Sequence, residues 1–296
     1  MKRIIIILIL IASLAPGCLE EPRTSEKIDV VTTFYPLYEF SKRIGGDKAE
    51  ISLLVPAGVE PHDWEPGPQD IIEIESAQIF VYNGAGLEPF VDRMLKNIES
   101  RKLISVNSIE GIELIKEGGA SDPHVWLDPV LAKHQVGAIE KAFIRADPAN
   151  SDYYRANAQA LMQDLDTLDA HISKELAPAK KKVFISSHSA FSYFARRYGL
   201  KQIAIAGLSP DLEPSPAQIA EIVKLARENK VKYIFFEALV SPKLSEVVAE
   251  EAGAQTLVLN PVEGLTDDQT KRGENYFTLM RENSRNLKLA LEVENG

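Results

Sequence analysis

The chain has 296 residues, of which 45% are hydrophobic, 26% charged and 7% aromatic, a composition typical of a globular protein rather than a disordered one. Its 43 acidic and 33 basic residues give a net charge of −10, which argues against nucleic acid as a partner because phosphates would repel it. A single cysteine excludes a disulfide framework and a cysteine-rich zinc module. Any site chemistry must therefore come from histidine, carboxylates and backbone groups.

The beginning of the chain predicts a signal for export across the cytoplasmic membrane. A basic start precedes the apolar run Ile4 to Ala12, which is too short to span a bilayer. Cys18 follows Ala15-Pro16-Gly17, an arrangement that resembles a lipobox, in which the thiol is acylated and becomes the new N-terminus. We expect removal of residues 1–17, a lipid on Cys18 that anchors the protein at the outer face of the membrane, and a flexible tether over residues 18–27. An unmodified cysteine in the signal region is the alternative.

The remainder of the chain predicts an α/β protein with mainly parallel sheets flanked by helices. Short apolar or β-branched runs bounded by proline and glycine indicate buried strands. These runs are Ile28–Tyr35, Ile51–Val55, Ile79–Tyr82, Leu103–Val106, Val183–Ser186, Ile203–Ile205, Tyr233–Phe236 and Thr256–Leu259. Helical spacing separates most of them, and such alternation places binding sites at the carboxyl edge of the strands.

One long helix is predicted between the two groups of strands. Its apolar residues follow the three-four spacing of a buried stripe, at Leu161, Leu165, Leu168 and Ile172. The predicted helix covers Ser151–Leu176, and at 1.5 Å per residue it runs for roughly 39 Å, enough to connect two lobes. We therefore expect an N-terminal α/β lobe over residues 28–150, a rigid connecting helix over residues 151–178 and a C-terminal α/β lobe over residues 179–296, with a ligand in the cleft between the lobes.

Three of the five histidines stand in loops beside predicted strands, namely His62, His124 and His188. Three neutral imidazoles and one oxygen complete the tetrahedral coordination of zinc. Each ring also needs an acceptor for its other N–H, and Asp63, Asp128 and backbone carbonyls are available nearby. The remaining histidines fall inside long helices, where we expect exposed or capping side chains: His134 and His171.

Several short motifs occur in one recognisable order along the chain. They are Val31-Thr32-Thr33-Phe34-Tyr35-Pro36-Leu37, Pro61-His62-Asp63, Asn83-Gly84-Ala85-Gly86-Leu87-Glu88, Asp122-Pro123-His124-Val125-Trp126-Leu127-Asp128-Pro129, Ser187-His188-Ser189-Ala190-Phe191, Glu213-Pro214-Ser215-Pro216, Phe235-Phe236-Glu237, Leu259-Asn260-Pro261 and Gly273-Glu274-Asn275-Tyr276. With these motifs the chain resembles the zinc/manganese-type solute-binding lipoproteins of ABC transporters, known as cluster A-I or cluster 9. The resemblance covers nearly the whole mature chain.

The resemblance implies a metal site in which the first three ligands fall on His62, His124 and His188. Members associated with manganese carry glutamate at the third position, whereas those associated with zinc carry histidine. His188 therefore favours Zn²⁺, with Mn²⁺ as the alternative, in agreement with the preference of zinc for an added imidazole. Some zinc members carry a His- and Asp-rich loop before the second ligand, but residues 117–121 contain no histidine, so we do not carry over the role of that loop.

The fourth ligand is where the sequence departs from the family, which usually has an aspartate at the position of Asn260. The neutral amide is a weaker donor, so we expect Asn260 oxygen or a water as fourth ligand, followed by Glu60, two residues before His62. By the family pattern Glu237 faces the same cleft, where we expect it to accept from a ligand ring. The alternative for Glu237 is a strand-end carboxylate satisfied by helix N-termini.

The resemblance implies a binding protein rather than an enzyme. It would capture the ion outside the cytoplasmic membrane, as a monomer, and deliver it to an ABC permease driven by a cytoplasmic ATPase. A zinc hydrolase is one rival, because three histidines and an open position also describe a catalytic site. However, the sequence has no HExxH helix and no G-x-S-x-G turn. A surface lipoprotein that acts as an adhesin is the other rival, without a separate binding module to support it.

Overall fold

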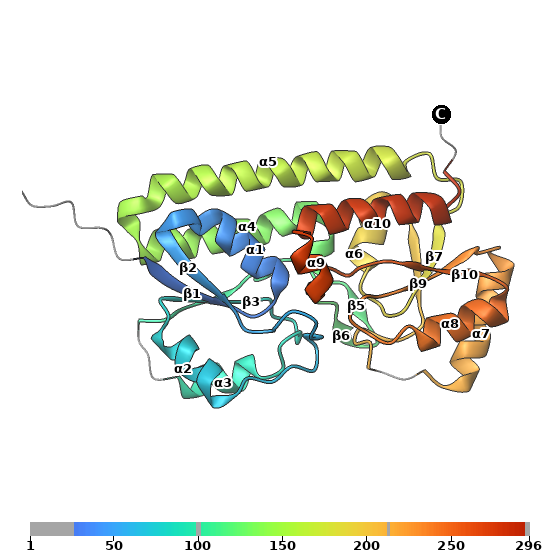
Figure 1. The fold of residues 1–296 in the computed structure, drawn as a ribbon, viewed down its shortest axis with the longest axis horizontal. Helices are drawn as coiled ribbons and strands as arrows, with labels where there is room; N and C mark the ends of the chain where they lie inside the picture. Colours follow the sequence, from blue (N-terminus) through green and yellow to red (C-terminus); the bar gives the residue numbers. More distant parts are fainter. Residues whose placement is uncertain (1–26, 99–101, 212–213, 294–296) are drawn as a thin grey trace, which may run out of the picture.

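The computed structural model of the chain describes residues 27–98, 102–211 and 214–293. The predicted signal peptide, Cys18 and residues 18–26 of the predicted tether lie outside the described residues. The described residues form two α/β lobes, each built on one parallel sheet of four strands, side by side beneath one long helix (Figure 1). The α/β fold with two parallel sheets, predicted from the strand and helix pattern, is confirmed.

The two sheets share one topology. The first sheet has the order β2-β1-β3-β4 and the second has the order β10-β9-β7-β8, which is the same order when it is traversed from its other edge. All neighbouring strands within each sheet are parallel. The strands are β1 (Ile28–Thr32), β2 (Ala49–Leu53), β3 (Ile79–Tyr82), β4 (Ile104–Asn107), β7 (Val183–Ser186), β8 (Lys201–Ala204), β9 (Tyr233–Phe236) and β10 (Gln255–Val258).

A small antiparallel hairpin, β5 (Lys116–Glu117) and β6 (Ala120–Ser121), precedes the second predicted ligand. Gly118 and Gly119 form its turn with φ of 58° and 88°, a conformation that glycine adopts without steric cost. This hairpin was not predicted from the sequence.

The helices cover the sheets and join the lobes. They are α1 (Tyr35–Gly45), α2 (Pro68–Ser76), α3 (Val91–Asn97), α4 (Pro129–Ala146), α5 (Ser151–Leu176), α6 (Ser192–Tyr198), α7 (Pro216–Glu228), α8 (Lys243–Ala252), α9 (Asp267–Lys271) and α10 (Tyr276–Ala290), with 3₁₀ turns at Gly46–Lys48, Val125–Leu127 and Pro148–Asn150. Helix α5 runs along one side of both lobes and packs against α1, α4 and α10 (Figure 1).

The hydrophobic core is continuous from one lobe to the other. The predicted stripe of α5, Leu161, Leu165, Leu168 and Ile172, is fully buried. It belongs to one cluster with Phe34 and Phe40 of the first lobe and Phe184 and Phe235 of the second. Because burial of each such side chain stabilises the fold by about 1.5–3 kcal/mol, the stripe fastens both lobes to one helix.

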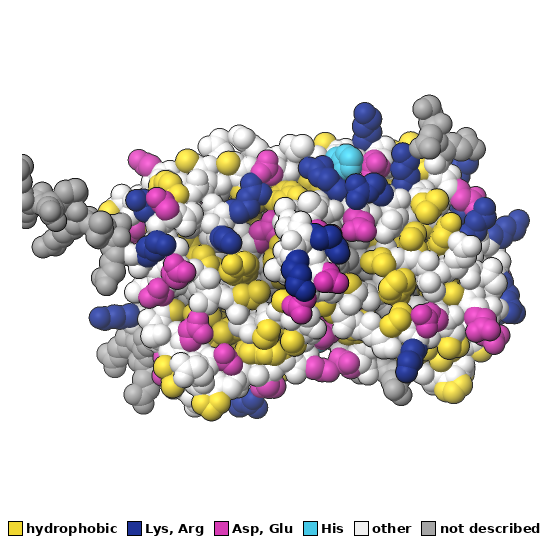
Figure 2. All heavy atoms as spheres, in the orientation of Figure 1, with side chains coloured by type: hydrophobic (Ala, Val, Ile, Leu, Met, Phe, Trp, Pro, Cys, Tyr) yellow, Lys and Arg dark blue, Asp and Glu magenta, His cyan; other side chains and the backbone are white. Residues whose placement is uncertain are grey.

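The surface of the described residues carries charges of both signs. Acidic and basic side chains are interspersed over the face drawn in Figure 2. Among the described residues, no helix combines the length and the apolar content needed to cross a membrane.

Candidate metal centre

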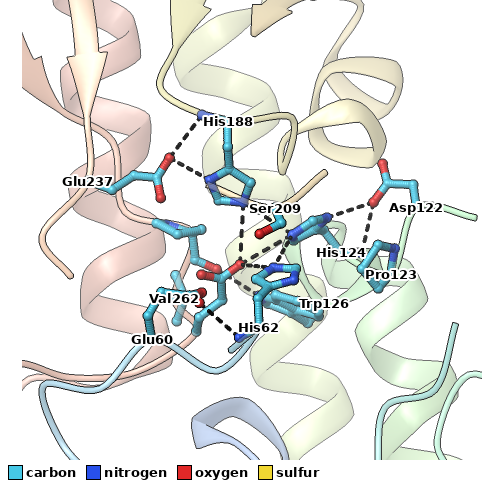
Figure 3. A network of polar contacts seen from close by, with 12 residues as sticks. Glu60, His62, Asp122, Pro123, His124, Trp126, His188, Ser209, Glu237 and Val262 are labelled. Carbon is cyan, nitrogen blue, oxygen red and sulfur yellow. Dashed lines mark hydrogen bonds and ion pairs between the residues drawn. The ribbon is translucent and has the colours of Figure 1, made fainter. Parts of the chain in front are cut away.

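The three loop histidines come from three separate segments that meet between the lobes. His62 lies in the loop between β2 and α2, His124 directly precedes the 3₁₀ turn ahead of α4, and His188 stands two residues beyond β7. The segments containing His62 and His188 both leave the carboxyl edge of a parallel sheet, which is where this kind of fold places ligands. The side chains of His62, His124 and His188 point toward one another in Figure 3.

Four ligand atoms converge on one point. The Nε2 atom of His124 lies 3.3 Å from Nε2 of His62 and 3.2 Å from Nε2 of His188. The Oε1 atom of Glu263 lies 3.5, 3.3 and 3.6 Å from Nε2 of His62, His124 and His188, respectively. Among the described residues, these four form the group of histidine and carboxylate side chains spaced to hold a metal ion.

Buried carboxylates orient two of the rings. Nδ1 of His124 lies 2.8 Å from Oδ1 of Asp122, and Nδ1 of His188 lies 2.7 Å from Oε1 of Glu237. A carboxylate accepts hydrogen bonds, so each Nδ1 donates its N–H, and each Nε2 faces the shared point, where its lone pair binds a metal once that nitrogen has lost its proton. Glu237 thus accepts a hydrogen bond from the ring of His188, which is the contact expected for it from the sequence. Asp128 does not serve in this way, because its side chain caps α4 by accepting from the backbone N–H of Val130.

The site is almost closed to solvent and its charges are strongly coupled. His124 and His188 are fully buried, and Glu263 is 2% exposed. Burial alone would lower the pKa of His188, but the carboxylates of Glu237 and Glu263 outweigh it and raise that pKa well above its usual range. Burial would raise the pKa of Glu263, yet contacts with the three imidazoles hold it well below its usual range. Glu263 is therefore an anion in the middle of the cluster.

Glu60 lies beside the cluster without joining it. One carboxylate oxygen, Oε2, accepts from the backbone N–H of His62 at 2.9 Å, while Oε1 is buried without a hydrogen-bond partner. Burial and the charge of Glu263 raise the pKa of Glu60 to about 8. At neutral pH the carboxyl group of Glu60 is therefore mostly protonated, which makes it a poorer ligand than Glu263.

Asn260 uses its side-chain oxygen to shape a turn. Its Oδ1 atom accepts from the backbone N–H of Val262 at 2.7 Å, and the residue is 4% exposed. Asn260 is not a member of the converging group, and the oxygen in that group comes from Glu263, three residues further along the chain. Sequence reasoning missed Glu263, although a signal was present: it is the one acid between Leu259 and Leu265, in the loop that follows the carboxyl end of β10.

The other two histidines lie away from the cluster. Nε2 of His134 lies 2.8 Å from the carbonyl oxygen of Glu110, and the residue is exposed. Nε2 of His171 lies 3.5 Å from Glu175 one turn further along α5. The structure places both on helices, as the sequence indicated.

The fold and the converging histidines define a class: two-lobed α/β binding proteins with a nitrogen-rich metal site between the lobes. A profile of the family described as "ZnuA: Zinc-uptake complex component A periplasmic" matches residues 30–290, and the chain belongs to this family. The family consists of binding components of zinc uptake systems, not of hydrolases, so the chain is not an enzyme.

Relatives and solved structures agree with this assignment. The chain is 44% identical over 288 residues to the high-affinity zinc uptake system protein ZnuA of Bacillus subtilis, covering 91% of this chain and 89% of that protein. It is 38% identical to the zinc-binding lipoprotein AdcA of Streptococcus pneumoniae, covering 99% of this chain but only 62% of AdcA. The crystal structure of the Zn(II)-bound ZnuA-like domain of the same AdcA superposes with a TM-score of 0.81 at 41% identity, covering 90% of this chain and all of that domain.

Proposed function

We propose that this chain captures one Zn²⁺ ion between its lobes for import, with Nε2 of His62, His124 and His188 and Oε1 of Glu263 as ligands. The spacing of these four atoms carries the proposal. A regular tetrahedron with metal–ligand bonds of about 2.0–2.1 Å has edges of about 3.3–3.4 Å. Five of the six edges of the cluster measure 3.2–3.6 Å, so an ion fits at its centre with little movement of the ligands.

The donor set favours zinc over manganese. Three imidazole nitrogens and one carboxylate oxygen suit a borderline-soft ion, whereas Mn²⁺ prefers a site richer in oxygen. The surroundings of the Glu263 carboxylate also support a cation as occupant. The buried Oε1 of Glu263 has no hydrogen-bond partner and faces three nitrogens, so an ion at the centre would satisfy all four atoms together.

The family and the sequence support a place for this chain in an uptake system. We propose that it hands the ion to an ABC permease powered by a cytoplasmic ATPase, and that it works as a monomer. We further propose that a lipid on Cys18 holds it at the outer face of the cytoplasmic membrane. Mass spectrometry of the membrane-extracted protein tests the anchor, since acylation adds the mass of the lipid to a chain that begins at Cys18. The alternative that the chain is a surface lipoprotein acting as an adhesin remains a prediction from the sequence alone.

Titration of metal-free protein with zinc, in competition with a chromophoric chelator, tests the proposed ligands. The variants Glu263→Gln and Glu60→Gln separate the two carboxylates that lie near the histidines. We expect Glu263→Gln to weaken zinc binding by orders of magnitude, because it removes both a ligand bond and the one negative charge that contacts all three rings. Glu60→Gln should have a much smaller effect, because Gln resembles the protonated carboxyl group and still offers an acceptor to the N–H of His62.

The opposite result would overturn the assignment. If Glu60→Gln weakened binding and Glu263→Gln did not, the fourth ligand would be Glu60. If wild-type protein bound Mn²⁺ more tightly than Zn²⁺ in the same competition, the proposed cargo would be wrong.

A further inference from the structure

The turn that carries Glu263 contains a strained backbone. Val262 has φ of 60°, in the left-handed region, and its side chain is fully buried. A β-branched residue adopts this conformation only where its surroundings impose it, because the β-carbon then crowds the following carbonyl group. Val262 directly precedes Glu263, so its backbone angles set the direction in which the ligand carboxylate leaves the chain.

Two neighbouring elements impose this conformation. The side chain of Asn283 in α10 forms hydrogen bonds with both backbone groups of Asn260. Its Oδ1 accepts from the N–H of Asn260 at 2.8 Å, and its Nδ2 donates to the carbonyl of Asn260 at 2.6 Å. The side chain of Asn260 then holds the N–H of Val262. From the other side, the indole N–H of Trp126 donates to the carbonyl of Pro261 at 2.7 Å.

These anchors are as deeply buried as the ligands themselves. Asn283 is 1% exposed and Trp126 is fully buried. The ring of Trp126 lies 5.2 Å from that of His124, so the same side chain contacts a ligand and restrains the turn (Figure 3). The backbone of Glu263 also accepts from the N–H of Tyr35 in the first lobe. The turn is thus fixed at every residue from Asn260 to Glu263.

We infer that Asn283 and Val262 are positioning residues that set the zinc affinity of the site through Glu263, without touching the ion. This inference rests on the proposed function and adds a mechanism to it. The anchors oppose the strain at Val262: when they hold, the carboxylate stands within 3.6 Å of all three rings. When they fail, Val262 relaxes to negative φ and turns the carboxylate away from the rings, which lowers affinity and speeds release.

The first experiment is a double-mutant cycle on zinc affinity. Asn283→Ala is made in the wild-type chain and in the Glu263→Gln chain, and zinc binding and the melting temperature of the metal-free protein are measured for all four. We expect Asn283→Ala to weaken binding by roughly tenfold to a hundredfold in the wild-type chain, as loss of a supporting hydrogen bond does at other metal sites. In the Glu263→Gln chain it should cause little or no further loss, because the ligand on which it acts is already gone.

A loss of equal size in both chains would overturn the inference, because it would show that Asn283 affects binding only through general destabilisation. This outcome is distinct from a failure of the proposed function, which would appear as unchanged affinity in Glu263→Gln alone.

The second experiment isolates the strain and does not depend on the folding of Asn283→Ala. Val262→Gly and Val262→Ala both remove the isopropyl group, but only glycine adopts the left-handed conformation without steric cost. We expect the Gly variant to bind zinc more tightly and release it more slowly than the Ala variant, by up to about tenfold. Stopped-flow chelation measures the release rate. Identical affinity and release in the two variants would show that the strain has no part in setting the site.

Discussion

The two lobes share one strand order, yet they use the segments that follow the first and third strands differently. In both sheets a residue that follows the first strand donates to a buried carboxylate that follows the third. In the first lobe this pair is Thr33 and Glu88, with Oγ1 of Thr33 donating at 2.6 Å. In the second lobe it is His188 and Glu237, with Nδ1 of His188 at 2.7 Å.

The two donors differ in whether they have a second polar atom that is free to bind a metal ion. Glu88 also accepts from the backbone N–H groups of Asn83 and Gly84, so it ties a loop together and faces no ligand. A hydroxyl group has no second nitrogen, whereas the imidazole of His188 presents Nε2 to the metal site. The segment after the first strand is therefore structural in the first lobe, where Thr33 donates to Glu88, and presents a ring nitrogen to the metal site in the second, where His188 lies one residue beyond Ser187, whose hydroxyl also donates to Glu237.

The largest effect should come from removing the two donors in parallel. His188→Ala should weaken zinc binding by orders of magnitude, because it removes one of four ligands. Thr33→Ala should leave zinc affinity close to wild type and lower the free energy of unfolding by about 1–3 kcal/mol, since it leaves a buried acceptor without its hydroxyl partner. Isothermal titration calorimetry and urea unfolding of the metal-free proteins measure the two quantities. His134→Ala and His171→Ala serve as controls with wild-type affinity, and a large loss of affinity in Thr33→Ala would remove the distinction between the lobes.

An intermediate effect is expected from the paired carboxylates. Glu237→Gln should weaken zinc binding by roughly 10–100-fold, because a neutral amide oxygen still accepts from the ring of His188 but polarises it much less than a carboxylate does. Glu88→Gln should instead destabilise the fold by about 1–3 kcal/mol, since it disturbs three hydrogen bonds to one buried group, with affinity unchanged. The same two measurements apply. Should Glu237→Gln change only stability, Glu237 would be a structural carboxylate like Glu88.

The smallest effect concerns the surface ion pairs that connect each lobe to α5. Arg197 of the second lobe pairs with Asp169 of α5, and this contact holds the pKa of Asp169 below its usual range. The stabilisation is therefore present above the ordinary aspartate pKa and is lost as pH falls through the lowered pKa of the folded state. We expect Asp169→Asn to cost at most about 1 kcal/mol at pH 7, because solvent screens the pair, and to cost progressively less below pH of about 4.

Urea unfolding at a series of pH values measures this effect. Asp164→Asn, which removes the partner of Arg43 in the first lobe, is the matched variant. A cost of Asp169→Asn that did not shrink at low pH would show that the pair acts by packing rather than by charge.

The sequence predicted the features that depend on local pattern. Apolar runs predicted all eight strands of the two sheets, although β8 begins at Lys201 and not at Ile203, and the three-four spacing predicted the buried stripe of α5. The hairpin β5–β6 was missed because each of its strands has only two residues, too few to show alternation.

The convergence of the three loop histidines followed from strand ends and family motifs, but the position of Glu263 did not. Asn260 was predicted as a candidate fourth ligand because it occupies the position at which the family usually has an aspartate. Its side chain instead closes a turn whose direction depends on the left-handed backbone of Val262 and on Asn283, 23 residues away. A valine in the sequence does not indicate a positive φ. The residues around the turn also do not predict hydrogen bonds from a distant helix. Both are tertiary effects that override local preference.

The most direct test of the site is a crystal structure of the zinc-loaded protein, with diffraction recorded on both sides of the zinc absorption edge. The account predicts one anomalous peak per chain, bonded at about 2.0–2.2 Å to Nε2 of His62, His124 and His188 and to a carboxylate oxygen of Glu263. A peak bonded to Asn260 or Glu60 in place of Glu263, or a peak away from the three histidines, would contradict it.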